Sequence, residues 1–367
     1  MSWLTDDDDD DRPYGEYDES DAHVRPNPRG SRPRTKQRPA YEDAVPGRVL
    51  TVDRGRMQVL LFEGTPEERD VQATRARELG KAGVVTGDAV DVVGDTSGEP
   101  GTLARIVRIE PRRTVLRRSA DDTDEVERVV VANADQLLIV VAAANPEPRP
   151  ALIDRYLVAA FDAGLDAVLL VTKTDLADPA PLLAEFAPLE LTVVTTTRGA
   201  DLSELRRLLL GRTTVAVGHS GVGKSTIVNA LVPAAGRATG VVNAVTGRGR
   251  HTSSSSVSLR VLATEQDLAD GLPPTGWIID TPGIRSFGLG HVDPANILRS
   301  FAIRSRPVAD PPDGIPLADA HDWEIVDRVN AGELGDAGRR RLESLQRLLD
   351  AQGGRVQGAD DETEPDS

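Results

Sequence analysis

The hydrophobic pattern of the chain changes twice, and each change marks a different kind of structure. Between residues 47 and 109, short runs of alternating apolar and polar residues are separated by glycines. Such alternation predicts strands with one buried face, at Gly47–Val52, Met57–Phe62, Val84–Val93 and Thr102–Ile109. Several short strands in so short a region predict a small β-barrel. An OB-like barrel fits best, and an SH3-like barrel has the same pattern.

From residue 129 onward, apolar strands alternate with amphipathic helices. The predicted strands are Val129–Val131, Gln136–Ala143, Ala167–Thr172, Thr192–Thr196, Thr213–Val217, Val257–Leu262 and Trp277–Asp280. The predicted helices are Ala151–Ala163, Pro181–Ala187, Leu202–Leu210 and Lys224–Leu231. This alternation predicts an α/β domain with a mainly parallel sheet and helices on both faces. Residues 293–350 contain no strand pattern and are predicted to be helical around a proline-rich loop.

Composition narrows the class of protein. The chain has 367 residues and no cysteine, which excludes disulfides, thiolate metal sites and cysteine nucleophiles. Its longest apolar run, Leu137–Ala144, has eight residues, far fewer than the about 20 that span a bilayer. The first residues do not resemble a signal peptide. We therefore expect a cytoplasmic protein with no membrane partner.

The net charge of −16 is unevenly distributed. Residues 6–21 contain ten acidic residues and one arginine, and residues 357–367 contain five acidic residues and no basic one. The rest of the chain is nearly neutral, so a nucleic-acid partner is not excluded. Six arginines within fourteen residues indicate either a solvated linker or a strip that contacts phosphates: Arg105, Arg108, Arg112, Arg113, Arg117 and Arg118.

A complete phosphate-binding loop follows the predicted strand Thr213–Val217 and begins a predicted helix. It reads Gly218-His219-Ser220-Gly221-Val222-Gly223-Lys224-Ser225, with Thr226 next. The glycines let backbone amides curl around phosphate oxygens, and the helix N-terminus adds its dipole. We expect Lys224 to reach the β- and γ-phosphates and Ser225 to bind Mg²⁺.

A second motif, Asp280-Thr281-Pro282-Gly283, follows a later strand. The Asp280 carboxylate can hold Mg²⁺ directly or through water, and the Gly283 amide can meet the γ-phosphate. The motif is weak alone, but its pairing with a complete phosphate loop makes it informative.

A third motif, Thr172-Lys173-Thr174-Asp175, follows the strand that begins at Ala167. A carboxylate at Asp175 can accept two hydrogen bonds from guanine that adenine cannot donate, which makes the site selective for guanine. The stem of Lys173 can lie along the base. Thr172 replaces the usual asparagine, and Thr195–Thr197 replaces the usual residues beside the guanine oxygen, so this part of the site is less well specified.

The order of the three motifs is informative. In ordinary GTPases the phosphate loop comes first and the base-binding motif last. Here the base-binding residues 172–175 precede the phosphate loop 218–225, and Asp280 follows both. This order predicts a circularly permuted P-loop GTPase domain, because the site requires proximity in space rather than in sequence.

These features together resemble the RsgA/YjeQ family. The resemblance rests on the predicted barrel, the permuted motif order, and Gly249-Arg250-His251-Thr252 between the phosphate loop and Asp280. It extends over about residues 45–350 and includes Ala132-Asn133-Ala134-Asp135-Gln136 and Asp154-Arg155-Tyr156-Leu157. The family consists of GTPases that depend on the small ribosomal subunit and act late in its maturation.

The resemblance implies a fold, a reaction and a partner. The reaction is GTP hydrolysis with Mg²⁺, stimulated by the 30S ribosomal subunit, with 16S rRNA and subunit proteins as contacts; we expect a monomer. The predicted segments are a disordered charged tail (1–44), an OB-fold-like β-barrel (45–112), a circularly permuted GTPase domain (113–292), a C-terminal helical domain (293–352) and a disordered acidic tail (353–367).

The chain departs from the family in two places. Family members usually bind zinc through three cysteines and one histidine in the C-terminal domain. The matching region here, Phe301 to Trp323, has no cysteine and only His321, so we predict no zinc site. His219 also replaces the usual polar amide of the phosphate loop.

The catalytic side chains are assigned through the resemblance. Ras-like enzymes orient the attacking water with a glutamine after the glycine of the Asp280 motif, and Ile284 occupies that place here. By position, the resemblance implies His251 as the catalytic side chain, together with Lys224, and Thr252 as a further Mg²⁺ ligand. Ser253 is an alternative ligand, and a histidine without catalytic role is the alternative for His251.

Two other functions remain open on the sequence alone. One is an ATP-dependent phosphotransferase built on the same phosphate loop, which Asp175 argues against. The other is an RNA-binding scaffold in which the nucleotide only stabilises the fold.

Overall fold

The structure, a computed structural model, describes residues 41–80, 83–119, 127–189, 191–232 and 256–281, and eight positions between 331 and 343. Residues 1–40 of the expected N-terminal tail, all of the expected acidic C-terminal tail and nearly all of the expected C-terminal helical domain lie outside these residues. The last four residues of the expected N-terminal tail, Tyr41 to Ala44, form a turn in which the Ala44 amide donates to the Tyr41 carbonyl at 3.1 Å. Among the described residues, no helix is both long and apolar enough to cross a membrane.

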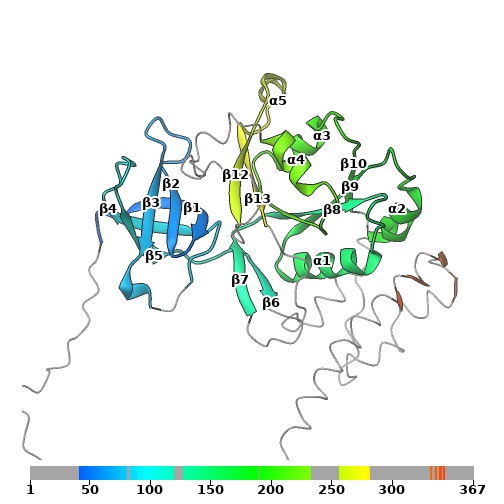
Figure 1. The fold of residues 1–367 in the computed structure, drawn as a ribbon, viewed down its shortest axis with the longest axis horizontal. Helices are drawn as coiled ribbons and strands as arrows, with labels where there is room; N and C mark the ends of the chain where they lie inside the picture. The colour runs from blue at the N-terminus through cyan, green and yellow to red at the C-terminus, as the bar shows by residue number, and fades with distance from the viewer. Residues whose placement is uncertain are drawn as a thin grey trace, which may run out of the picture. The chain divides into compact units, whose positions relative to one another are not determined.

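Five strands near the N-terminus close a small barrel (Figure 1). They are β1 (Val45–Asp53), β2 (Arg56–Leu61), β3 (Arg69–Arg75), β4 (Ala89–Gly94) and β5 (Ala104–Ile109), with the short 3-10 helix η2 (Arg77–Leu79) after β3. The pairing runs β1-β2-β3-β5-β4 and returns from β4 to β1, with β3 and β5 parallel and the other pairs antiparallel. This connection confirms the predicted OB-like barrel.

The barrel differs from the prediction at two strands. Strand β3 was not predicted, because only Val71 and Ala73 of its seven residues point a hydrophobic side chain into the core. The single predicted strand Val84–Val93 is a turn followed by β4. The turn forms around Asp88, which is fully buried, accepts the Val85 amide at 2.8 Å and pairs with Arg112 at 2.7 Å.

The second part is a six-stranded sheet covered by helices. Its strands are β8 (Gln136–Ala142), β9 (Asp166–Thr172), β10 (Thr192–Thr195), β11 (Thr213–Val217), β12 (Val257–Leu262) and β13 (Thr275–Asp280). Their order is β10-β9-β8-β11-β13-β12, parallel throughout except for β12, which runs antiparallel to β13. A two-stranded hairpin, β6 (Val115–Ser119) and β7 (Glu127–Ala132), connects barrel and sheet.

The helices cover both faces of the sheet, as predicted. They are α1 (Pro150–Asp162), α2 (Ala180–Phe186), the 3-10 helix η3 (Ala187–Leu189), α3 (Ser203–Leu209), α4 (Lys224–Leu231) and α5 (Glu265–Ala269). Figure 1 shows α1 on one side of the central strands and α3 and α4 on the other. All seven residues of β8 are buried. From Leu137 to Ala142, alternate residues of β8 pack on the α1 and α2 side and on the α3 and α4 side, which explains why these six residues are all apolar.

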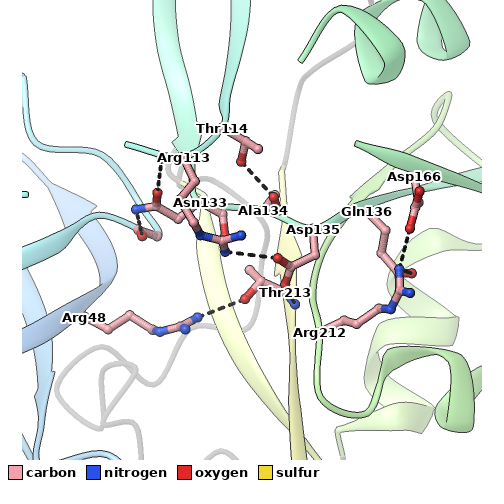
Figure 2. A network of polar contacts seen from close by, with 11 residues as sticks. Arg48, Arg113, Thr114, Asn133, Ala134, Asp135, Gln136, Asp166, Arg212 and Thr213 are labelled. Atoms are coloured by element: carbon pink, nitrogen blue, oxygen red, sulfur yellow. Dashed lines mark hydrogen bonds and ion pairs between the residues drawn. The ribbon is translucent and has the colours of Figure 1, made fainter. Parts of the chain in front are cut away.

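A network of hydrogen bonds and ion pairs connects the amino ends of the parallel strands (Figure 2). Asp135, just before β8, accepts the Thr213 backbone amide of β11 at 2.7 Å and pairs with Arg113 at 3.0 Å. Asn133 accepts the Arg113 amide at 2.9 Å and donates to the carbonyl of Gly87 in the barrel at 3.0 Å. These two residues therefore join the barrel to the sheet.

The same network continues across β8 and β9. Arg212 donates to Asp166 at 2.6 Å and to Gln136 at 3.3 Å. The buried Gln136 in turn donates to the Thr214 hydroxyl at 2.8 Å and to the Leu208 carbonyl at 2.9 Å. We call Arg113, Asn133, Asp135, Gln136, Asp166 and Arg212 the amino-end network.

Three of the six clustered arginines have structural partners. Arg112 pairs with the buried Asp88, Arg113 with Asp135, and Arg108 with Asp91 at 2.7 Å. The predicted strip of phosphate-contacting arginines is therefore interrupted by residues that stabilise the fold.

Candidate nucleotide-binding site

The phosphate loop lies between the buried strand β11 and helix α4. Gly218 approaches β8 so closely that a Cβ atom there would lie 2.4 Å from the Val140 carbonyl oxygen. Gly223 precedes the helix with φ of 96°, a conformation that side-chain-bearing residues rarely adopt. The sequence thus places the first turn of α4, with Lys224, Ser225 and Thr226, directly after the loop, where its free amides form an anion site.

Lys224 and Asp280 meet at this end of the sheet. The Lys224 ammonium group forms an ion pair with the Asp280 carboxylate, and the two side chains are 14% and 20% exposed. Ala216 of β11 lies opposite Asp280 of β13, so the parallel pairing itself brings the two motifs together. The buried Thr281 hydroxyl donates to the Ala216 carbonyl at 2.9 Å and fixes the end of β13.

Thr172 and Lys173 attach the base-binding motif to the phosphate loop. The buried Thr172 hydroxyl lies 2.6 Å from the Val222 carbonyl oxygen and 3.1 Å from that of Val141. The Lys173 ammonium group donates to the carbonyl of Gly221 at 2.8 Å and to the carbonyl of Asn145. A threonine in place of the usual asparagine therefore still connects the two motifs.

The remaining residues of the motif face the end of β10. The Thr174 amide and hydroxyl both lie 3.4 Å from the Thr196 carbonyl oxygen. Asp175 is exposed, which leaves its carboxylate accessible to a ligand. In the phosphate loop, His219 Nδ1 lies 2.9 Å from the Ser220 carbonyl oxygen.

The described residues thus bring the three motifs to one edge, the carboxyl ends of β9, β11 and β13. The predicted residues His251, Thr252 and Gly283, and the alternative Ser253, lie outside the described residues. The region Phe301 to Trp323 also lies outside them, so the structure does not test the predicted lack of zinc.

Comparison with known proteins agrees with this geometry. Residues 109–290 match the family model described as RsgA GTPase. A Chromohalobacter salexigens protein named small ribosomal subunit biogenesis GTPase RsgA is 37% identical over 254 residues, 66% of this chain and 69% of the relative. A protein of the same name from Chlorobaculum tepidum is 33% identical over 293 residues, 77% of this chain and 90% of the relative. The chain belongs to the RsgA GTPase family.

Solved structures support the fold of this RsgA-family chain. The crystal structure of YjeQ from Thermotoga maritima superposes with a TM-score of 0.60 at 22% identity, over 85% of this chain and 99% of that one. The crystal structure of YloQ, described as a circularly permuted GTPase, also has a TM-score of 0.60, at 19% identity over 89% and 99% of the two chains. The predicted circular permutation is therefore confirmed.

Sequence reasoning missed several residues that stabilise the fold of this RsgA-family chain away from the candidate site. Asn133, Asp135 and Gln136 were noticed only as part of the resemblance, and the structure gives each a bonding role in the amino-end network. Asp154 and Tyr156 of the second resembling motif are buried in α1, and burial raises the pKa of Tyr156 to about 12. No chemical signal in the sequence marks such residues, since their partners are distant in sequence.

Proposed function

We propose that this chain is a GTP hydrolase that binds the small (30S) ribosomal subunit and acts in its late maturation, with hydrolysis stimulated by the subunit. The proposal rests above all on one observation, the meeting of Lys224, Asp280 and the Thr172–Asp175 motif at one edge of a permuted GTPase sheet. The names of the relatives, small ribosomal subunit biogenesis GTPase, support the partner.

The residues of this edge divide the work of binding. The exposed Asp175 carboxylate accepts hydrogen bonds from guanine, and the Lys173 stem lies along the base. Adenine cannot donate these two hydrogen bonds, and a site built to accept them discriminates against the wrong base by up to about 10⁴-fold. The loop from Gly218 to Ser225 holds the phosphates. When the nucleotide binds, the Lys224 side chain moves from Asp280 so that its ammonium group contacts the β- and γ-phosphate oxygens.

The oxygen atoms here fit a magnesium ion. Asp280 provides a carboxylate and Ser225 a hydroxyl, the ligand types that this hard cation prefers. Asp280 already faces a positive charge in its ion pair with Lys224. We assign Mg²⁺ to Ser225, Asp280 and, by position in the sequence, Thr252. When bound, the ion neutralises charge on the phosphate oxygens.

Water activation is assigned to His251, because Ile284 has no polar group for it. A histidine side chain can orient water or accept a proton near neutral pH. The dependence on a subunit follows if this histidine reaches its working position only on the ribosome. If a His251→Ala variant retains the full hydrolysis rate, a group other than His251 activates the attacking water.

The chain is proposed to act in the cytoplasm as a monomer and to contact 16S rRNA and subunit proteins. Within the described part of the chain, Arg105, Arg117 and Arg118 have no ion-pair partner, in contrast to Arg108, Arg112 and Arg113. We assign the phosphate contacts first to these three arginines.

The test is GTP hydrolysis by the purified protein with and without 30S subunits, with ATP and a Lys224→Ala variant as controls. Stimulation by the subunit that is lost in the variant and absent with ATP supports the proposal. If GTP is hydrolysed at the same rate with and without the subunit, the chain is a GTP hydrolase but the proposed ribosomal partner is wrong. RNA binding without hydrolysis would favour the scaffold.

A further inference from the structure

The barrel meets the GTPase sheet at the two strands that lead to Asp280. Strand β12 is the edge of the six-stranded sheet, and its outer side pairs with β1 of the barrel, with Thr51 opposite Val257. On the inner side of the same strand, Val257 lies opposite Asp280. One row of three residues therefore runs from the barrel to the carboxylate that pairs with Lys224.

Trp277, three residues before Asp280 on β13, is held mainly by barrel residues. Two guanidinium groups contact its ring, that of Arg48 of β1 at 5.5 Å and that of Arg260 of β12 at 4.9 Å from the centroid. Its indole N–H donates to Glu63, beyond the end of β2, at 2.7 Å, and Glu63 also pairs with Arg48 at 3.3 Å. Such a buried aromatic side chain with a satisfied N–H has one well-defined position.

Arg48 and Arg260 extend these contacts to both parts of the molecule. Arg48 donates to the Thr213 hydroxyl of β11 at 3.0 Å, and Arg260 pairs with Glu68 of the barrel at 2.6 Å. Leu50 and Leu60 of the barrel complete a small apolar cluster with Trp277. The last strand before Asp280 is therefore packed against the barrel.

Thr86 supplies a second contact, at the start of β12. This buried barrel residue donates its hydroxyl to the carbonyl of Ser256 at 3.0 Å, and Ser256 directly precedes Val257. The neighbouring Gly87, with φ of 89°, leaves no room for a side chain, since a Cβ would lie 2.1 Å from the Ala132 carbonyl oxygen.

Backbone hydrogen bonds hold the Thr86 turn on two sides. The Gly87 amide donates to Val49 of β1 at 2.9 Å, and the Thr86 carbonyl accepts the Ala132 amide of β7 at 3.0 Å. Because this turn is fixed to the barrel and to the hairpin before β8, it presents its hydroxyl to Ser256 in a fixed place.

We infer that Thr86 and Trp277 are positioning residues for GTP hydrolysis, through which the barrel fixes β12 and β13 and thereby Asp280. The inference rests on the proposed function. A β-strand at the edge of a sheet takes its position from what covers it, and here the cover is the barrel. Small displacements of a catalytic group lower reaction rates strongly. The barrel is then part of the catalytic unit as well as a binding module.

The experiment compares Thr86→Val, which is close in shape and lacks the hydroxyl, with Thr86→Ser, which retains it. Thr102→Val is the control, because the Thr102 hydroxyl also donates to a backbone carbonyl, but to that of Glu99 within the barrel at 2.7 Å rather than to a residue next to β12. The readouts are kcat and KM for GTP, the Kd of a fluorescent GDP, and the melting temperature. We expect Thr86→Val to lower kcat about tenfold through misplacement, with KM and Kd changed by less than about twofold.

Thr86→Ser and Thr102→Val are expected to keep the wild-type kcat. A second variant, Trp277→Phe, keeps an aromatic ring but loses the N–H bond to Glu63, and should also lower kcat at unchanged Kd. A normal kcat in both Thr86→Val and Trp277→Phe, with only the melting temperature reduced, would overturn the inference and leave a purely structural junction. If the wild-type protein does not hydrolyse GTP even when 30S subunits are present, the proposed function fails instead, so the two failures are distinguishable.

Discussion

Both ends of the parallel sheet carry clustered charges, yet only one has the properties of a site. At the amino ends, Arg113 pairs with Asp135 and Arg212 with Asp166, so each charge of the amino-end network has a partner of opposite sign. At the carboxyl ends Lys224 and Asp280 pair with each other, but Asp175 is exposed and Lys173 is held by neutral backbone carbonyls. A cluster of charges is therefore not by itself a sign of function.

The backbone explains the contrast. The carboxyl ends adjoin the phosphate loop and the first turn of α4, whose amides have no partner within the helix and can bind an anion. At the amino ends the corresponding amides are satisfied, as when Asp135 accepts the Thr213 amide. We therefore propose that the end with free backbone donors binds the ligand, and that the end whose donors are satisfied stabilises the fold. Four experiments test this contrast, from the largest expected effect to the smallest.

Removing a lysine at the carboxyl end should have the largest effect. Lys224→Ala removes the ammonium group that we propose binds the phosphates, and it should lower the rate of GTP hydrolysis by about 10²–10³-fold. The matched change at the other end, Arg212→Ala, breaks an exposed ion pair and should leave the rate within about twofold. Steady-state phosphate release measures both. If Arg212→Ala lowered the hydrolysis rate as much as Lys224→Ala does, the amino ends of the sheet would also contribute to the reaction, and the contrast between the two ends would be wrong.

Changing the base-reading carboxylate should alter specificity more than stability. Asp175→Asn replaces an acceptor with a mixed donor and acceptor, so the affinity for GDP should fall about 100-fold while that for the xanthine nucleotide rises. Asp178→Asn, a nearby exposed carboxylate that accepts the Ala180 amide at 3.0 Å, is the control. Competition binding with fluorescent GDP measures both affinities. If Asp175→Asn retains the wild-type preference for guanine, Asp175 does not bind the base.

Two buried threonines give a matched pair across the sheet. Thr172→Val leaves the Val222 carbonyl of the phosphate loop without its donor, and the Kd for GDP should rise about tenfold. Thr214→Val at the amino end removes the acceptor of Gln136 and should lower the free energy of unfolding by about 1–2 kcal/mol without changing that Kd. Titration and urea unfolding separate the two effects. Weaker GDP binding in Thr214→Val would mean that the amino-end network also shapes the site.

The smallest effect is expected for Asp135→Asn. The amide can still accept the Thr213 backbone N–H, and only the partly exposed ion pair with Arg113 is lost. Urea unfolding should show a loss of about 0.5–1 kcal/mol, with hydrolysis unchanged. A loss several times larger would indicate that the ion pair itself, rather than the backbone bond, closes this end of the sheet.

Much of the candidate site was predictable because its parts are local in sequence. The glycines of the phosphate loop, Lys224 and the adjoining strand occur within a few residues, and their spacing is set by the same backbone geometry in any protein that holds phosphate this way. The position of Asp280 was predictable from its place at a strand end, since parallel strands bring such ends together. The motif order then predicted the permutation that the comparison with YloQ confirmed.

Other features depend on partners far apart in the chain and gave no local signal. The predicted strand Val84–Val93 was wrong in its first half, because the buried Asp88 and its partner Arg112 make a turn there. Thr172 stands where an asparagine was expected, and only the structure shows that its hydroxyl donates to the Val222 carbonyl of the phosphate loop. Trp277 was predicted merely as a strand residue, and its barrel partner Glu63 lies more than 200 residues earlier.

The sequence by itself determined the classes of fold, a β-barrel and a permuted sheet, and it identified the motifs that we propose bind a guanine nucleotide. These depend on short-range backbone geometry and on the periodicity of buried residues, both of which can be read from short stretches of the sequence. Only the tertiary structure decided which charges remain available and which are paired, and which part of the molecule covers the edge strand beside Asp280. Those outcomes depend on distances between residues that the chain brings together only when it folds.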